Sequence, residues 1–284
     1  MVKTNEPEGP LASSAPIASS PKPDQPVGPV PWVWLVLGLV LPTLVTWIYF
    51  DALSSFPPWM QQLAYGLGKA SQFALPLVVI AIWGQWWRGV IPWWKQEESA
   101  EGASAPSKEL EGWDRLARPI GAIGVGLAIG GLMLVVYRFW LLPNGVVETA
   151  RVEGEAKLQA LGMKSPWALL GLAAFYSLLH SGLEEWYWRG FVFAGWKGRI
   201  GTQASLVVSS LGFMSHHVLV LAKFFGWTSI WTGITSAGVA IGGAIWAWML
   251  WRSRSLLPGW ISHAIVDAAI FAIAWHLIFA APNA

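Results

Sequence analysis

The sequence contains a series of long runs without a single charged side chain. No Asp, Glu, Lys or Arg occurs in residues 25–50, 70–87, 119–137, 165–183, 200–222 or 224–251, and residues 255–284 hold only Asp267. A helix of about 20 residues crosses the ~30 Å hydrocarbon layer of a bilayer. Buried helices of soluble proteins are usually shorter. These runs therefore predict membrane-spanning helices and argue against a soluble fold.

The overall composition agrees with a membrane protein. Charged residues make up 12% of the chain, whereas soluble domains average about 25%. Many of the 22 Trp lie near the ends of the apolar runs, where indole prefers the headgroup zone. The absence of Cys excludes disulfides, thiolate nucleophiles and Cys-ligated metals. The net charge of +2 gives no sign of a nucleic-acid partner.

We predict an all-α fold, a polytopic membrane helix bundle with about seven transmembrane helices. The expected helices lie near residues 32–52, 62–87, 119–142, 166–195, 203–225, 228–251 and 256–280. Residues 1–30, rich in Pro, Ser and Ala, predict a disordered tail. Residues 31–142 hold the N-terminal spans with a polar loop at 95–118. Residues 143–165 form a polar connection that could include a short interfacial helix, and residues 166–284 form a C-terminal helical core.

The Lys and Arg residues of the predicted loops are unevenly divided between the two sides of the membrane. The side that receives the N-terminal tail holds eleven of them and the other side holds five. Cytoplasmic loops carry the excess of positive charge, so the N-terminus is expected in the cytoplasm. With seven spans the C-terminus would lie outside.

Two adjacent carboxyls, Glu184 and Glu185, lie in the fourth predicted span. A charged residue at the centre of a spanning helix costs about 2.5–3.5 kcal/mol on insertion scales, so such residues need a reason. Adjacent side chains point about 100° apart on a helix. Glu185 is spaced to form an i, i+4 ion pair with Arg189. Glu184 then points elsewhere without this partner, as suits a general base in a low-dielectric site.

Further ionisable residues occur in two later spans. His217 lies in the fifth, and His263 and Asp267 share a face of the seventh at i, i+4. The directions of the three spans would bring Glu184, His217 and His263 into one cavity in the cytoplasmic half of the bilayer. Three other histidines are expected to be hydrogen-bonded packing residues, as single intramembrane histidines often are: His180, His216 and His276.

At these residues the sequence resembles a known family. The segments Glu184-Glu185-x-x-x-Arg189, Phe213-x-x-x-His217 and His263-x-x-x-Asp267 match, in order, the three motifs of the CPBP group, the CAAX proteases and bacteriocin-processing enzymes also called Abi. The resemblance covers roughly residues 166–280. It implies a glutamate-type intramembrane endopeptidase acting on a membrane-associated protein or peptide.

The resemblance also implies a role for each motif residue. Glu184 would activate water as the general base, and His217 would orient that water or share its proton. His263 with Asp267 would stabilise the oxyanion, and Glu185 with Arg189 would hold the helix geometry. Many members carry Asn where this chain has Asp267, so Asp267 is expected to hold His263 protonated as the donor instead.

No cofactor is expected, and zinc is the nearest rival chemistry. The sequence lacks His-Glu-x-x-His, the usual zinc-protease motif, although His180 lies one turn before Glu184. Two other functions remain open: a non-catalytic binding or immunity scaffold of the same fold, and a proton or ion transporter, because intramembrane carboxyls and histidines also build proton relays. The expected location is the cytoplasmic membrane of a bacterium, with the lipid bilayer as a partner.

Overall fold

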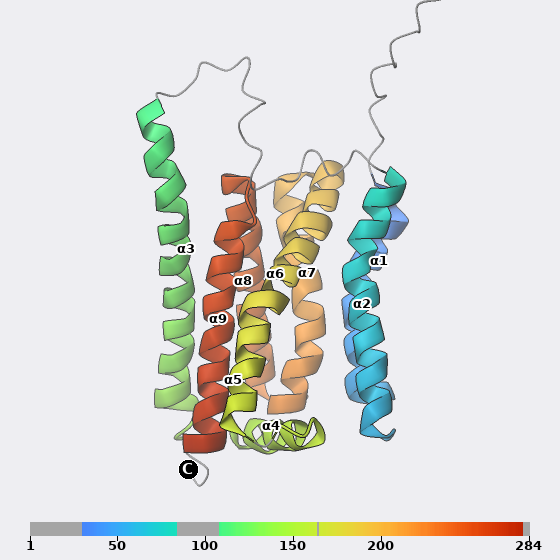
Figure 1. The fold of residues 1–284 in the computed structure, drawn as a ribbon, viewed down its shortest axis with the longest axis vertical. Coiled ribbons are helices and arrows are strands. Elements are labelled where there is room, and N and C mark those ends of the chain that lie inside the picture. Colours follow the sequence, from blue (N-terminus) through green and yellow to red (C-terminus); the bar gives the residue numbers. More distant parts are fainter. Residues whose placement is uncertain (1–29, 84–107, 164, 281–284) are drawn as a thin grey trace, which may run out of the picture.

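The computed structural model describes residues 30–83, 108–163 and 165–280. Within these ranges the chain is helical apart from short connections and contains no strand, which confirms the all-α prediction (Figure 1). Of the predicted tail at 1–30 only Val30 is described. Residues 95–107 of the predicted loop at 95–118 also lie outside the described residues.

Short π-helical segments, labelled η, interrupt or extend several of the α-helices. The elements in chain order are α1 (Trp32–Trp47), η1 (Ile48–Ala52), α2 (Pro58–Trp83), α3 (Lys108–Val136), η3 (Tyr137–Leu141), α4 (Glu148–Ala160), α5 (Pro166–Ala174), η4 (Phe175–His180), α6 (Ser181–Glu185), η5 (Trp186–Phe193), α7 (Ala194–Phe225), α8 (Ile230–Ser253), α9 (Leu257–Trp275) and η6 (His276–Ala280).

Six segments of the described chain are long and apolar enough to cross a membrane. One of them, Pro166–Phe225, has 60 residues, which as a straight helix would extend for about 90 Å. It is broken at Gly201, where φ is 80°, a left-handed value that glycine adopts readily. The segment can therefore cross twice, giving seven crossings and a multi-pass membrane protein.

The ends of two helices differ from the sequence-based prediction. α3 begins at Lys108, so the end of the predicted polar loop, residues 108–118, is helical. α2 begins at Pro58 instead of residue 62, because proline lacks the N–H that a first helical turn leaves unbonded and has a suitable φ angle.

α4 lies across one end of the bundle, roughly perpendicular to the spanning helices (Figure 1). The sequence analysis allows a short interfacial helix in this connection, and the structure has a helix of 13 residues there. In its first turn Arg151 donates a 3.0 Å hydrogen bond from Nε to Glu148, which lowers the pKa of the Glu148 carboxyl. Near its end Lys157 donates to the Tyr49 hydroxyl at 3.0 Å and so ties α4 to η1.

Close approach of small residues holds α3 against α9, its neighbour in Figure 1. A Cβ atom added at Gly126 would lie 2.9 Å from Ile265 Cβ, and one at Gly130 would lie 3.0 Å from Ala269 Cβ. Helices in lipid associate by such packing, since apolar burial drives little association between them there. Large apolar side chains such as Leu127, 60% exposed, face outward, as lipid-facing residues do.

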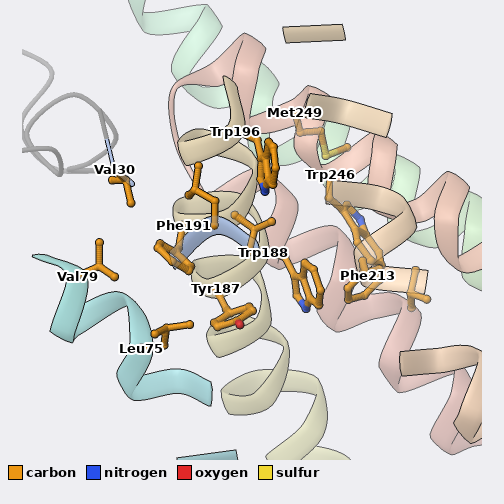
Figure 2. Close-up of a cluster of buried hydrophobic side chains, with 13 residues drawn as sticks. Val30, Leu75, Val79, Tyr187, Trp188, Phe191, Trp196, Phe213, Trp246 and Met249 are labelled. Atoms are coloured by element: carbon orange, nitrogen blue, oxygen red, sulfur yellow. The ribbon is translucent and has the colours of Figure 1, made fainter. Parts of the chain in front are cut away.

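An aromatic core surrounds η5, the turn that follows the two adjacent glutamates (Figure 2). Tyr187, Trp188 and Phe191 are all 0% exposed. They pack between α2 on one side and Phe213 of α7 with Trp246 of α8 on the other. The Tyr187 hydroxyl also donates to the Gly38 carbonyl of α1 at 2.8 Å. This core fixes the helix that carries both carboxyls.

Candidate active site

Glu184 and Glu185 lie in α6, a five-residue α-helical segment between the π-helical segments η4 and η5. Their exposed fractions are 3% and 1%. A π turn holds one more residue than an α turn and is frequent at functional sites. Both carboxyls therefore lie deep in the bundle, on a helix of unusual geometry.

Three histidines surround the Glu184 carboxylate. His180 Nε2 lies 3.3 Å from Glu184 Oε1, and His216 Nε2 lies 3.6 Å from the same oxygen. His263 Nε2 lies 3.9 Å from Oε2. These rings come from η4, α7 and α9. A carboxylate and three imidazoles thus meet between three membrane crossings.

Glu185 is held on one oxygen by two partners. Its Oε1 lies 3.1 Å from a guanidinium nitrogen of Arg189, which confirms the predicted i, i+4 ion pair. The same oxygen accepts a 2.9 Å hydrogen bond from His263 Nδ1. Arg189 is 1% exposed, donates to the Gly243 carbonyl at 3.3 Å and lies over the Phe213 ring at 4.5 Å.

The orientation of His263 is fixed from several sides. Its ring stacks on Trp246 at 4.0 Å with 13° between the planes, and the Trp246 indole N–H donates to Ser262 Oγ at 3.1 Å. Because Nδ1 faces Glu185, Nε2 faces the other two carboxylates: Asp267 Oδ1 is 3.7 Å away. His263 therefore connects both glutamates with Asp267.

His217 lies beside this cluster and contacts neighbours on its own helix. Its Nδ1 faces the Phe213 carbonyl at 2.9 Å, and its ring is 4.1 Å from that of His216. His216 stacks on Trp188 with 3° between the planes. The structure thus brings Glu184, Glu185, His263 and Asp267 together as the sequence suggests, and it places His216 nearer to Glu184 than His217.

The structure gives a polar partner to each of the three histidines that are expected to be hydrogen-bonded packing residues. His276 Nδ1 and the Tyr137 hydroxyl share a 2.6 Å hydrogen bond away from the carboxyl cluster. His180 and His216 instead contact Glu184. The sequence held a signal for each: His180 precedes Glu184 by four residues, and His216 is adjacent to His217.

Gly259 of α9 lies against Glu185. A Cβ atom at this position would come within 2.7 Å of Glu185 Oε2, so the glycine leaves the space that the carboxylate occupies. Pro258, just before it, lies in the first turn of the helix. The start of α9 is therefore shaped around Glu185 and brings His263 to it one turn later.

This arrangement suits proton transfer to and from a bound water. A buried carboxylate beside several imidazoles can accept, hold and return a proton. In the described part of the chain, no group of three or more His, Cys, Asp or Glu side chains has the arrangement of a metal site. Each histidine near Glu184 instead directs a ring nitrogen at a carboxylate oxygen.

Comparison with known protein families gives a match over the part of the chain that holds these residues. Residues 163–269 match a family model described as type II CAAX prenyl endopeptidase Rce1-like. The curated proteins and the solved structures gave no match. The matched segment contains every residue of the three motifs, from Glu184 to Asp267, and supports a membrane endopeptidase. Over residues 163–269 this membrane protein is therefore similar to the Rce1-like type II CAAX prenyl endopeptidases, consistent with the CPBP group that the three motifs resemble.

Proposed function

We propose that the protein is an intramembrane endopeptidase that hydrolyses a peptide bond of a membrane-associated protein or peptide with water activated by Glu184. The observation that carries this proposal is the Glu184 carboxylate itself, 3% exposed and within 4 Å of histidines from η4, α7 and α9. A buried carboxylate costs insertion energy, and such residues in spanning helices mark functional sites.

In the proposed reaction a water lies between Glu184 and the carbonyl carbon of the substrate. Glu184 takes one proton as the water oxygen bonds to that carbon, and the carbonyl oxygen becomes negative. Collapse of this tetrahedral intermediate breaks the C–N bond, and protonated Glu184 returns its proton to the departing amine. One carboxylate thus serves as base and then as acid.

His217 is proposed to take part in orienting the water. A carbonyl oxygen can only accept, so the 2.9 Å contact with Phe213 places the Nδ1–H of a neutral His217 on that side. Its Nε2 then carries a lone pair that can accept a hydrogen bond from the water. His180 and His216, which lie on Glu184 Oε1, are proposed to hold the carboxylate in place.

His263 is the proposed oxyanion donor. With both nitrogens protonated it donates from Nδ1 to Glu185 and presents Nε2–H on the side of Glu184. Asp267, at 3.7 Å, balances the imidazolium charge. A fixed donor aimed at developing negative charge is worth several kcal/mol in a water-poor site. Glu185 and Arg189 are proposed to position His263 without touching the substrate.

The proposed location is the cytoplasmic membrane of a bacterium, with the N-terminus in the cytoplasm. Support comes from the excess of Lys and Arg in loops on the side of the N-terminus. The site would then lie in the cytoplasmic half of the bilayer, open to substrates made in the cytoplasm.

The test compares wild-type protein, Glu184→Gln and Glu148→Gln, each purified in detergent and incubated with the solubilised membrane proteome of the host. Gln keeps the shape of Glu184 and removes the base. Glu148 is exposed on α4 and serves as the control. New peptide termini should appear with wild type and control and be absent with Glu184→Gln. Identical products from all three proteins would refute the proposal, and biological activity retained by Glu184→Gln would favour a binding scaffold.

A further inference from the structure

Trp260 lies in the first turn of α9, the helix that also carries Gly259 and His263. Tryptophans near the ends of spans are commonly membrane anchors, with the indole directed at the headgroup zone. Trp260 is 37% exposed, but its N–H is directed at a neighbouring span. It donates a 2.9 Å hydrogen bond to the Leu178 carbonyl of η4. Trp260 therefore joins two spans to each other.

The same indole also packs on α6. A Cβ atom added at Gly182 would lie 3.2 Å from Trp260 Nε1 and 3.4 Å from its Cε2, which is closer than a side-chain carbon normally comes. Gly182 therefore leaves the room that the ring needs to reach the Leu178 carbonyl, one turn earlier. The indole thus covers the junction between η4 and α6, and Glu184 follows Gly182 by two residues.

The carbonyls at this junction use donors from outside the backbone ladder. Backbone hydrogen bonds join residues five apart in a π turn and four apart in an α turn, so one carbonyl is skipped where the first changes into the second. Two consecutive carbonyls near the end of η4 accept from side chains: the Ser181 hydroxyl donates to Ser177 at 2.6 Å, and Trp260 donates to Leu178. At membrane depth no water replaces a missing donor, so both side chains stabilise the π turn.

The beginning of α9 follows the helix of the two carboxyls, beside which it runs in Figure 1. Gly259 lies against Glu185 Oε2, Trp260 lies on the turn before Glu184, and His263 Nε2 lies 3.9 Å from Glu184 Oε2. His263 meets Glu184 only while the two helices keep this register. The indole hydrogen bond holds α9 and the π turn in it.

We propose that Trp260 is a positioning residue for Glu184: its indole N–H holds the Leu178 carbonyl, and with it the π turn that directs the Glu184 carboxylate toward His263. The inference rests on the proposed function and adds a residue that touches neither the water nor the peptide. Without this hydrogen bond the turn before Glu184 loses a donor and loosens, while the groups that bind the peptide stay in place. The chemical step should then slow, and peptide binding should not weaken.

The experiment removes the indole N–H of Trp260 in two ways. Trp260→Phe keeps an aromatic ring without the donor. Benzothienylalanine at position 260, introduced by stop-codon suppression, keeps the ring shape with sulfur in place of N–H. Trp275→Phe is the matched control, because Trp275 lies on the same helix, is also 37% exposed and contacts Phe279 about three turns beyond His263. For each purified protein, kcat and KM are measured on a peptide that wild type cuts and Glu184→Gln does not.

Both changes at Trp260 should lower kcat by about 10- to 100-fold, the range for a catalytic group misplaced by up to about 1 Å, and leave KM unchanged. Trp275→Phe should match wild type. Backbone amides of residues 175–185 should exchange hydrogen for deuterium faster in Trp260→Phe than in Trp275→Phe, because a loosened turn opens more often. Gly182→Ala crowds the indole and should lower kcat, but it should have little further effect in Trp260→Phe.

Several outcomes would overturn the inference. One is a folded Trp260→Phe protein with the kcat of wild type, and another is unchanged amide exchange in residues 175–185. Wild-type kcat with benzothienylalanine would show that ring packing matters and the N–H does not, and this protein decides the question if Trp260→Phe does not fold. An equal loss of kcat in Trp275→Phe would show a general effect of the helix. Failure of the proposed function is distinct, because then wild type itself shows no Glu184-dependent cleavage.

Discussion

Gly259→Ala tests whether Glu185 positions the catalytic group. The added Cβ would lie 2.7 Å from Glu185 Oε2, whereas carbon and oxygen settle at about 3.3 Å. The carboxylate must therefore move by about 0.6 Å. Its other oxygen is held by Arg189 at 3.1 Å and by His263 at 2.9 Å, so the movement will turn or loosen both contacts.

The cost to stability should be small and the cost to activity large. Overpacking a core costs about 1–3 kcal/mol. We expect the lower end, because Oε2 is the tip of a side chain and has no hydrogen-bond partner among the described residues. About 1 kcal/mol lowers the melting temperature by roughly 2–4 °C in a protein of this size. Misplacing a catalytic group by about 1 Å can cost 10²-fold in rate, so kcat should fall at least tenfold.

The assay combines thermal unfolding in detergent with cleavage of a substrate found in the proteome comparison. Gly131→Ala is the matched control: a Cβ there meets nothing within 4 Å, and Ala in a helix stabilises by about 0.5–1 kcal/mol over Gly. Unchanged kcat in a folded Gly259→Ala protein would show that the Glu185 contacts do not position His263. A large loss of stability with normal kcat would make Glu185 purely structural.

Four further results are expected. Gly126→Leu should destabilise the detergent-solubilised protein by about 1–3 kcal/mol by separating α3 from α9, whereas Gly131→Leu should change the unfolding midpoint little; equal effects would contradict the packing described. Arg189→Met should cost about 3–5 kcal/mol in chemical unfolding, because a buried carboxylate loses its cation; a stable variant would exclude a structural role. Chelators should leave cleavage unchanged, and activity lost to a chelator and restored by zinc would refute the metal-free reaction. Arg151→Ala should raise the lowered pKa of Glu148 toward its ordinary value in an NMR titration. In the parent protein the Glu148–Arg151 pair stabilises α4 fully at a pH above the ordinary pKa of Glu148. This stabilisation is lost as the pH falls through the lowered pKa.

The spans are readable from the sequence because hydropathy acts over about 20 residues at once. The ends of the helices are harder to predict from the sequence. α3 starts at Lys108, within a stretch whose polar residues are typical of a loop. The same averaging hides Lys69, since one charge barely changes the mean of a long apolar window. Its ammonium lies over the Phe73 ring, and that ring is 5.9 Å from the His180 ring, a proximity that only the packing of α2 against η4 reveals.

Contacts within one helix were predictable, and contacts between helices were not. The Glu185–Arg189 pair follows from i, i+4 spacing. The hydrogen bond from His263 to Glu185 joins residues far apart in sequence and depends on how α9 packs. Likewise His216 and His217 point about 100° apart, and which ring turns toward Glu184 depends on how α7 packs in the bundle.

Because π-helical segments lie on both sides of α6, the directions of its side chains depend on the exact number of residues in these segments. Each π turn contains one residue more than an α turn would, and removing that residue would rotate everything beyond it by about 100°. A single deletion in η4 or η5 would therefore keep the span apolar and helical while turning Glu184 and Glu185 away from the histidines of α7 and α9. Insertions and deletions, which surface loops accept readily, should be as damaging here as the loss of the glutamate itself.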